Sequence, residues 1–107
     1  MAAMNMTTDM FKNLIHGDKP VLIDFWAPWC TYCRRIAPAY DRIADQYADS
    51  MVVTKVNIDE EELLAIQERI EVLPTLVLYR DGEALGSIVA PASKAMIDTF
   101  IQETLAK

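Results

Sequence analysis

The sequence predicts an α/β fold in which a mixed sheet of four to five strands is flanked by helices on both faces. Apolar runs of strand length alternate along the chain with segments whose apolar residues recur at helical spacing. The run at residues 21–25 is apolar almost throughout, which is typical of a strand buried on both faces. Asp81-Gly82, between two later runs, favours an antiparallel hairpin. A parallel β-α-β half followed by this hairpin gives a mixed sheet.

In the first half of the chain, Thr7 or Thr8 can cap a helix that Gly17 ends. Its apolar face comprises Phe11, Leu14 and Ile15. The strand at residues 21–25 follows. If residues 2–6 add a short edge strand, the sheet has five strands, and otherwise four. A second helix then shows apolar residues at helical spacing: Ile36, Tyr40, Ile43, Ala44 and Tyr47.

In the second half, a strand at residues 51–58 precedes Asp59 and Glu62, whose spacing indicates a capping box. We expect the core face of the helix that follows to be Leu63, Ile66 and Ile70. The hairpin strands then cover residues 75–79 and 84–89. Ser93 caps a last helix, whose apolar residues are Ile97, Phe100, Ile101 and Leu105.

Composition narrows the function. The 107 residues suit one domain, which we expect to span residues 1–107 as a monomer. A net charge of −6 argues against nucleic acid as a partner, because phosphate binding needs clustered Lys and Arg. No apolar run approaches the roughly 18 residues of a membrane-spanning helix, so no membrane contact is expected. The first residues lack the pattern of a signal peptide, and we expect a cytoplasmic location.

Cys30 and Cys33, the only two cysteines, lie between the strand at residues 21–25 and the helix that follows. Cys30 is therefore expected near a helix N-terminus, where the helix dipole stabilises a thiolate. The spacing alone also allows a structural staple or a metal site. A staple over so small a loop would add little stability. A structural zinc site usually has four ligands, and the chain offers only this one cysteine pair and a single histidine, His16. We therefore expect no metal.

Four features in register resemble the thioredoxin family, from about residue 7 to the end of the chain. They are the Trp-Ala-Pro-Trp-Cys-x-x-Cys motif at residues 26–33, Asp24 in the preceding strand, Lys55 in the next strand, and Leu73-Pro74-Thr75 opening the third. The resemblance implies the thioredoxin fold and an enzyme that performs dithiol–disulfide exchange.

The resemblance also implies a role for each residue. Cys30 would be the attacking thiolate, Cys33 the buried resolving thiol, and Pro74 a cis proline facing both. If Asp24 is buried, desolvation raises its pKa, and it can accept the proton of Cys33 through a water. Lys55 would partly offset that shift. The alternative is that Asp24 and Lys55 form a plain structural ion pair.

Substrate contacts are expected around the cysteines. A disulfide-containing protein substrate would dock as an extended strand along Val72 and Leu73, with Trp29 and the loop at Ala90 completing an apolar rim. The chain lacks a G-x-G-x-x-G motif, so no bound dinucleotide or other cofactor is expected. In the family, a flavin-containing thioredoxin reductase that draws on NADPH usually recycles the protein.

Two departures from the family pattern lie at the site. Thr31-Tyr32 stands where most thioredoxins carry Gly-Pro, and it restores a backbone donor near Cys30. We expect a Cys30 pKa at or below ~7 and a potential less negative than about −270 mV. Alternatively, Tyr32 packs over Cys33 and slows exchange. Ala90-Pro91 replaces the usual Gly-Ala, which predicts a narrower choice of substrates.

The main functional prediction is a protein-disulfide reductase working through Cys30 and Cys33. A disulfide oxidase or isomerase uses the same chemistry, and Thr31-Tyr32 favours it. A non-catalytic binding module, in which the cysteines are incidental, is the third interpretation. The combination of Asp24, Lys55 and Pro74 with both cysteines argues against it.

Overall fold

The computed structural model describes residues 3–107 and confirms the predicted mixed sheet. Its five strands lie in the order β1-β3-β2-β4-β5, with β1, β3 and β2 parallel and β4 and β5 each antiparallel to its neighbour. The strands are β1 (Met4–Asn5), β2 (Val21–Trp26), β3 (Val52–Asn57), β4 (Thr75–Arg80) and β5 (Glu83–Val89). Of the four- and five-stranded alternatives the second holds, with β1 as the edge strand; residue 2 of the range 2–6 lies outside the described residues.

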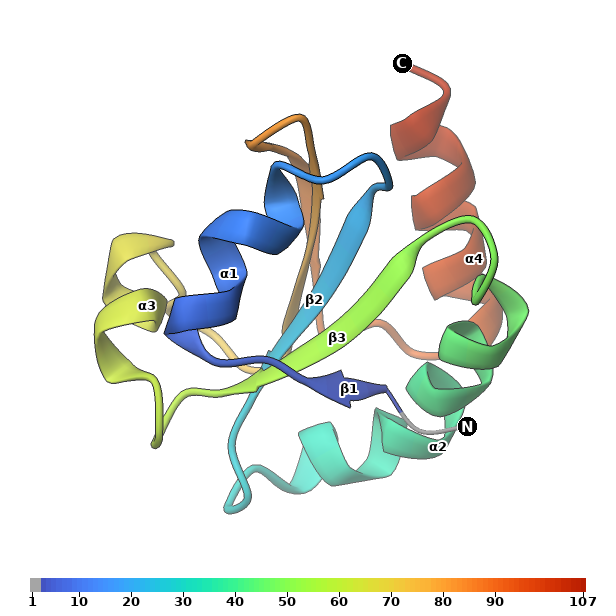
Figure 1. Ribbon diagram of the computed structural model, residues 1–107. Helices are drawn as coiled ribbons and strands as arrows, with labels where there is room; N and C mark the ends of the chain where they lie inside the picture. Colours follow the sequence, from blue (N-terminus) through green and yellow to red (C-terminus); the bar gives the residue numbers. More distant parts are fainter. Residues whose placement is uncertain (1–2) are drawn as a thin grey trace.

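Helices cover both faces of the sheet, with α1 and α3 on one side and α2 and α4 on the other (Figure 1). The helices are α1 (Thr8–Ile15), α2 (Thr31–Gln46), α3 (Glu62–Gln67) and α4 (Lys94–Leu105). This arrangement explains why β2 is apolar except at Asp24. Leu22 packs in the core cluster with α2 and α4, whereas its neighbour Ile23 packs in the cluster with α1.

The hairpin and the last helix form as predicted. Asp81 and Gly82 have φ values of 53° and 83°, the left-handed conformations that the tight turn between β4 and β5 requires. The Gly82 N–H donates to the Ile15 carbonyl at 2.8 Å, which fastens the turn to the end of α1. Ser93 caps α4, since its hydroxyl accepts from the Met96 N–H at 3.2 Å.

Helix α3 departs from the prediction in both its cap and its buried face. The predicted capping box is wrong, because Glu61 is the N-cap residue and its side chain makes no capping hydrogen bond. The predicted core face is wrong at Leu63 and Ile66, which are 79% and 72% exposed, while Leu64 and Ala65 are buried. With six residues, α3 spans less than two turns, so helical periodicity had too few residues to fix its phase.

The Glu61 side chain serves a different helix. Its Oε1 accepts from the backbone N–H of Thr8 at 2.6 Å, at the start of α1. Thr7 occupies the N-cap position of α1 as predicted, but its own side chain makes no capping bond. A carboxylate 53 residues away in sequence therefore satisfies one free N–H of this helix terminus.

Candidate active site

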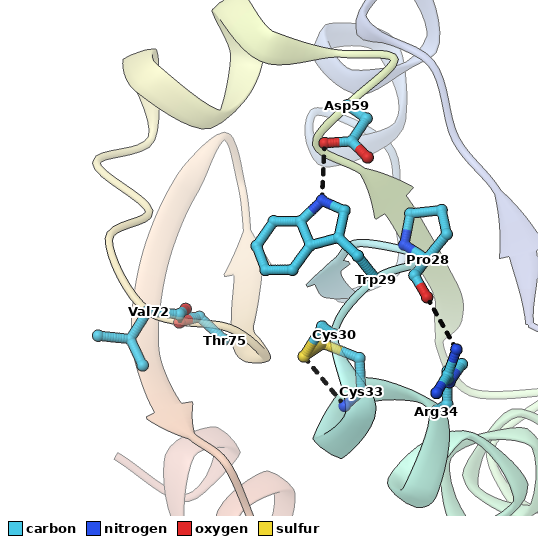
Figure 2. Close-up of a disulfide and its surroundings, with 8 residues drawn as sticks. All are labelled: Pro28, Trp29, Cys30, Cys33, Arg34, Asp59, Val72 and Thr75. Carbon is cyan, nitrogen blue, oxygen red and sulfur yellow. Dashed lines mark hydrogen bonds between the residues drawn. A yellow bond between two sulfur atoms is a disulfide. The ribbon is translucent and has the colours of Figure 1, made fainter.

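The two cysteines lie where the sequence places them, at the turn between β2 and α2, and they form a disulfide. Cys30 is the N-cap residue of α2, and its Sγ accepts from the Cys33 N–H at 3.2 Å (Figure 2). Cys30 is 9% exposed and Cys33 only 2%. The two sulfurs therefore differ in access, and an external disulfide reaches Cys30 more readily.

Asp24 lies in the middle of β2 and is 4% exposed, with Lys55 of β3 directly beside it in the sheet register. Burial raises the pKa of Asp24 to about 7, and the nearby Lys55 charge offsets only part of that rise. Its Oδ1 has no hydrogen-bond partner among the described residues. The Lys55 Nζ lies 5.2 Å from the centroid of the Trp26 ring, as a cation–π contact.

A small cavity of about 60 Å³ connects the buried carboxyl group to the redox centre. It is lined by Asp24, Trp26, Cys33, Arg34, Ala37, Tyr40, Asp41 and Lys55. Its lining is partly polar, and its volume exceeds what an ordered water requires. The geometry thus gives Asp24 and Cys33 a shared space through which a water can carry a proton.

The loop before β4 forms one border of the redox centre. The peptide bond between Leu73 and Pro74 is cis, as predicted. The Thr75 hydroxyl donates to the Val72 carbonyl at 2.5 Å and holds the turn together. Val72 is 52% exposed, whereas Pro74 is buried. Figure 2 shows the Val72 side chain pointing away from the two cysteines.

Trp29 stands on another side of the disulfide and is 65% exposed. Its indole N–H donates to Asp59 Oδ1 at 3.2 Å, so the ring is held although it faces solvent (Figure 2). The role of Asp59 was missed from the sequence, which assigned this residue to a helix cap. No spacing rule could link two residues 30 positions apart.

Comparison with known proteins agrees with this geometry. The family model for thioredoxin matches residues 2–103. Thioredoxin 1 of Nostoc is 41% identical over 105 residues, covering 97% of this chain and 98% of the relative. Thioredoxin of the alga Porphyra purpurea is 35% identical, with coverage of 96% and 97%. The chain belongs to the thioredoxin family.

A solved structure supports the same assignment. The crystal structure of a thioredoxin from Malassezia sympodialis matches with a TM-score of 0.86 and 31% identity, covering 97% of this chain and 92% of that one. The thioredoxin fold is thus confirmed, and the chain is a thiol–disulfide oxidoreductase with a redox-active cysteine pair. Within residues 3–107, no helix is long and apolar enough to span a membrane.

The two departures from the usual thioredoxin pattern meet in space. Thr31 is the exposed first residue of α2, and Tyr32 after it is half-buried against the cluster that contains both cysteines. The Tyr32 hydroxyl donates to the Pro91 carbonyl at 3.0 Å. Ala90, beside Pro91, has a φ of 46°, a left-handed conformation that favours glycine. Tyr32 therefore packs against the cluster of Ala27, Cys30 and Cys33. The predicted packing over Cys33 itself, and its effect on the exchange rate, stay predictions.

Proposed function

We propose that this thioredoxin-family protein is a protein-disulfide reductase acting as a single domain over residues 1–107. One observation carries the proposal: a disulfide at a helix N-cap shares a cavity with a buried carboxyl group whose pKa is raised to about 7. A group that titrates near neutral pH beside a thiol is suited to general acid–base work there. A purely structural staple needs no such group.

In the proposed first step, the reduced protein presents Cys30 as a thiolate. The positive end of the α2 dipole and the Cys33 N–H, which faces the Cys30 sulfur, stabilise its charge. The thiolate attacks one sulfur of a substrate disulfide, and a new S–S bond forms between Cys30 and the substrate. The other substrate sulfur leaves as a thiolate and takes a proton from solvent.

In the second step, Cys33 resolves the mixed disulfide. Asp24, in its ionised form, accepts the Cys33 proton through a water in the shared cavity. The Cys33 thiolate then attacks the Cys30 sulfur, and the second substrate sulfur leaves with the electron pair of the broken bond. The substrate gains two electrons, and the protein ends with the Cys30–Cys33 disulfide. Lys55 moderates the pKa of Asp24, so that the ionised form is populated near neutral pH.

We place the substrate chain along Val72 and Leu73, as an added strand that runs past the cis Pro74. The half-exposed Val72 and the exposed indole of Trp29 offer apolar contact on two sides of the disulfide. Thr31, Tyr32 and Ala90 complete the proposed docking surface. Such an apolar rim beside a reactive sulfur suits protein substrates.

Recycling would use an external reductase, because the proposed reaction leaves the protein oxidised. The family suggests a thioredoxin reductase as that partner, with protein disulfides as substrates. The predictions of no bound cofactor or metal, a monomer and a cytoplasmic location stand as predictions. Cell fractionation and size-exclusion chromatography would check the last two.

The decisive experiment is insulin reduction by dithiothreitol, followed by turbidity. We expect the wild-type protein to accelerate it and Cys30→Ser to abolish the acceleration. Cys33→Ser is the matched control, because it keeps the attacking sulfur and should accumulate a mixed disulfide with substrate that Cys30→Ser cannot form. Equal rates for wild type and Cys30→Ser would overturn the proposal in favour of a non-catalytic binding module.

The disulfide oxidase is the second candidate, and the environment of Cys30 favours it. The Cys33 N–H already faces the Cys30 sulfur, and Tyr32 contributes a backbone N–H that proline lacks. Stabilising the thiolate makes the disulfide more oxidising. We predict a reduction potential less negative than about −270 mV, measured by equilibration against glutathione. A potential at or below that value would contradict this prediction and support the reductase direction.

A further inference from the structure

The loop at residues 89–91 is held from two sides. The Ala90 N–H donates to the Pro74 carbonyl at 2.9 Å, which ties the loop to the cis proline. The Pro91 carbonyl accepts from the Tyr32 hydroxyl at 3.0 Å, which ties the loop to the helix that carries the disulfide. Pro91 is buried, and Ala90 stays left-handed between these two bonds. The loop is therefore fixed despite the strain at Ala90.

The Tyr32 side chain spans the space between α2 and this loop. Tyr32 and Leu73 both pack against the same cluster of Ala27, Cys30 and Cys33. A peptide strand that lies on Leu73 beside the disulfide therefore has the Tyr32 ring as a neighbour. Because the Tyr32 hydroxyl donates a hydrogen bond to the Pro91 carbonyl, a substrate chain that continued between α2 and the loop would have to break that bond.

We propose that Tyr32 is a specificity-determining residue. It makes the protein prefer disulfides next to which the substrate chain turns away from the protein. Disulfides within long extended segments are exchanged less readily. The inference rests on the proposed function and adds the class of substrate: disulfides at loop tips or near chain ends. Tyr32 acts through its hydrogen bond to Pro91, which closes the space between α2 and the loop at residues 89–91. A neutral hydrogen bond of this kind contributes about 1 kcal/mol, equivalent to about a fivefold change in affinity.

The test compares two synthetic peptides with wild type and Tyr32→Phe. One peptide is a disulfide-closed ring without flanking residues, and the other carries the same ring with extended flanking chain on both sides. Reduced protein is mixed with excess oxidised peptide, and acid-quenched samples give the KM and the maximum rate of exchange. We expect Tyr32→Phe to lower the ratio of the flanked to the unflanked KM by about fivefold. The substitution should change KM more than it changes the maximum rate.

Tyr47→Phe is the matched control, since it removes a hydroxyl at the other end of α2, where it donates to Asp98 at 2.7 Å. This variant should keep the wild-type KM ratio. A ratio for Tyr32→Phe equal to that of Tyr47→Phe, or a fall in the maximum rate for both peptides alike, would overturn the inference and leave the proposed function standing. Failure of the wild type to exchange with either peptide would overturn the proposed function itself, and this inference with it.

Discussion

Two aspartates of this protein occupy opposite environments. Asp24 in β2 is buried at the end of the molecule that carries the Cys30–Cys33 disulfide, here called the redox end. Its Oδ1 has no hydrogen-bond partner among the described residues. Asp98 in α4 accepts hydrogen bonds from Tyr47 at 2.7 Å, Gln46 at 3.0 Å and Lys94 at 2.9 Å. Burial raises the pKa of Asp24 to about 7, whereas the hydrogen bonds from Tyr47 and Lys94 lower the pKa of Asp98.

The contrast separates two uses of one side chain. Asp98 joins α2 to α4 through hydrogen bonds and an ion pair that stabilise its negative charge. Its contribution is therefore to the stability of the fold. Asp24 is kept where its charge is poorly solvated, which favours unfolding but gives a group that titrates near neutral pH. The left-handed Ala90 lies at the same end, as does the indole nitrogen of Trp26, which has no hydrogen-bond partner within residues 3–107. These unfavourable features lie where the proposed chemistry takes place, whereas two other left-handed residues, Arg69 and Asp81, lie elsewhere in the chain.

The largest effect is expected for Asp24→Asn. The carboxyl pKa is 3.8 before folding and about 7 in the folded protein, so the folded state holds its proton to higher pH. The contribution of Asp24 to stability is therefore complete below pH 3.8 and is lost as the pH rises through about 7. A shift of this size corresponds to roughly 4 kcal/mol. Asn cannot ionise, so this pH-dependent loss disappears.

Urea unfolding of both proteins between pH 4 and pH 8 would measure the effect. From pH 4 to pH 8, the free energy of unfolding of Asp24→Asn should increase by roughly 4 kcal/mol relative to that of the wild type. In the insulin assay, the same variant should be slower, because Cys33 loses its proton acceptor. A constant difference in stability from pH 4 to pH 8 would show that Asp24 titrates normally.

Asp98→Ala should have the opposite sign and a smaller size. It removes three hydrogen bonds at a partly exposed position, and we expect a loss of about 1–2 kcal/mol in the free energy of unfolding at pH 7. Because the folded pKa of Asp98 is lowered, its stabilisation is present above pH 3.8 and is lost as the pH falls through the folded value. The deficit of the variant in urea unfolding should therefore shrink in acid. An increasing deficit in acid would contradict the assignment.

Most of the fold followed from local patterns. The nearly continuous apolar run of β2 predicted burial on both faces, and Leu22 and Ile23 do face different clusters. The resemblance to thioredoxins indicated Cys30, Asp24 and the cis Pro74 as site residues. These features depend on residues that are close in sequence or fixed by a motif, so the sequence alone sufficed to indicate them.

The contacts that the sequence could not predict join distant residues. Tyr32 reaches Pro91 across 59 positions, and Trp29 reaches Asp59 across 30. Each bond depends on how segments far apart in the sequence lie after folding: helix α2 and the loop at Pro91 in one case, two turns in the other. The prediction of the buried face of the six-residue helix α3 was wrong for a related reason. That face is set by tertiary packing rather than by the helical period of the sequence.

Ala90→Gly tests the redox end with the smallest expected effect. Alanine at a φ of 46° is strained, and glycine adopts that conformation freely, but glycine also loses more backbone entropy on folding. The net gain in the free energy of unfolding should be about 0.5–1 kcal/mol. Ala92→Gly is the matched control, since Ala92 is exposed and outside the left-handed region, and it should be destabilising. If the methyl group of Ala90 also narrows the proposed docking surface, Ala90→Gly should speed insulin reduction and Ala92→Gly should not. A gain in stability without a faster rate would confirm the strain at Ala90 and show that its methyl group does not limit docking.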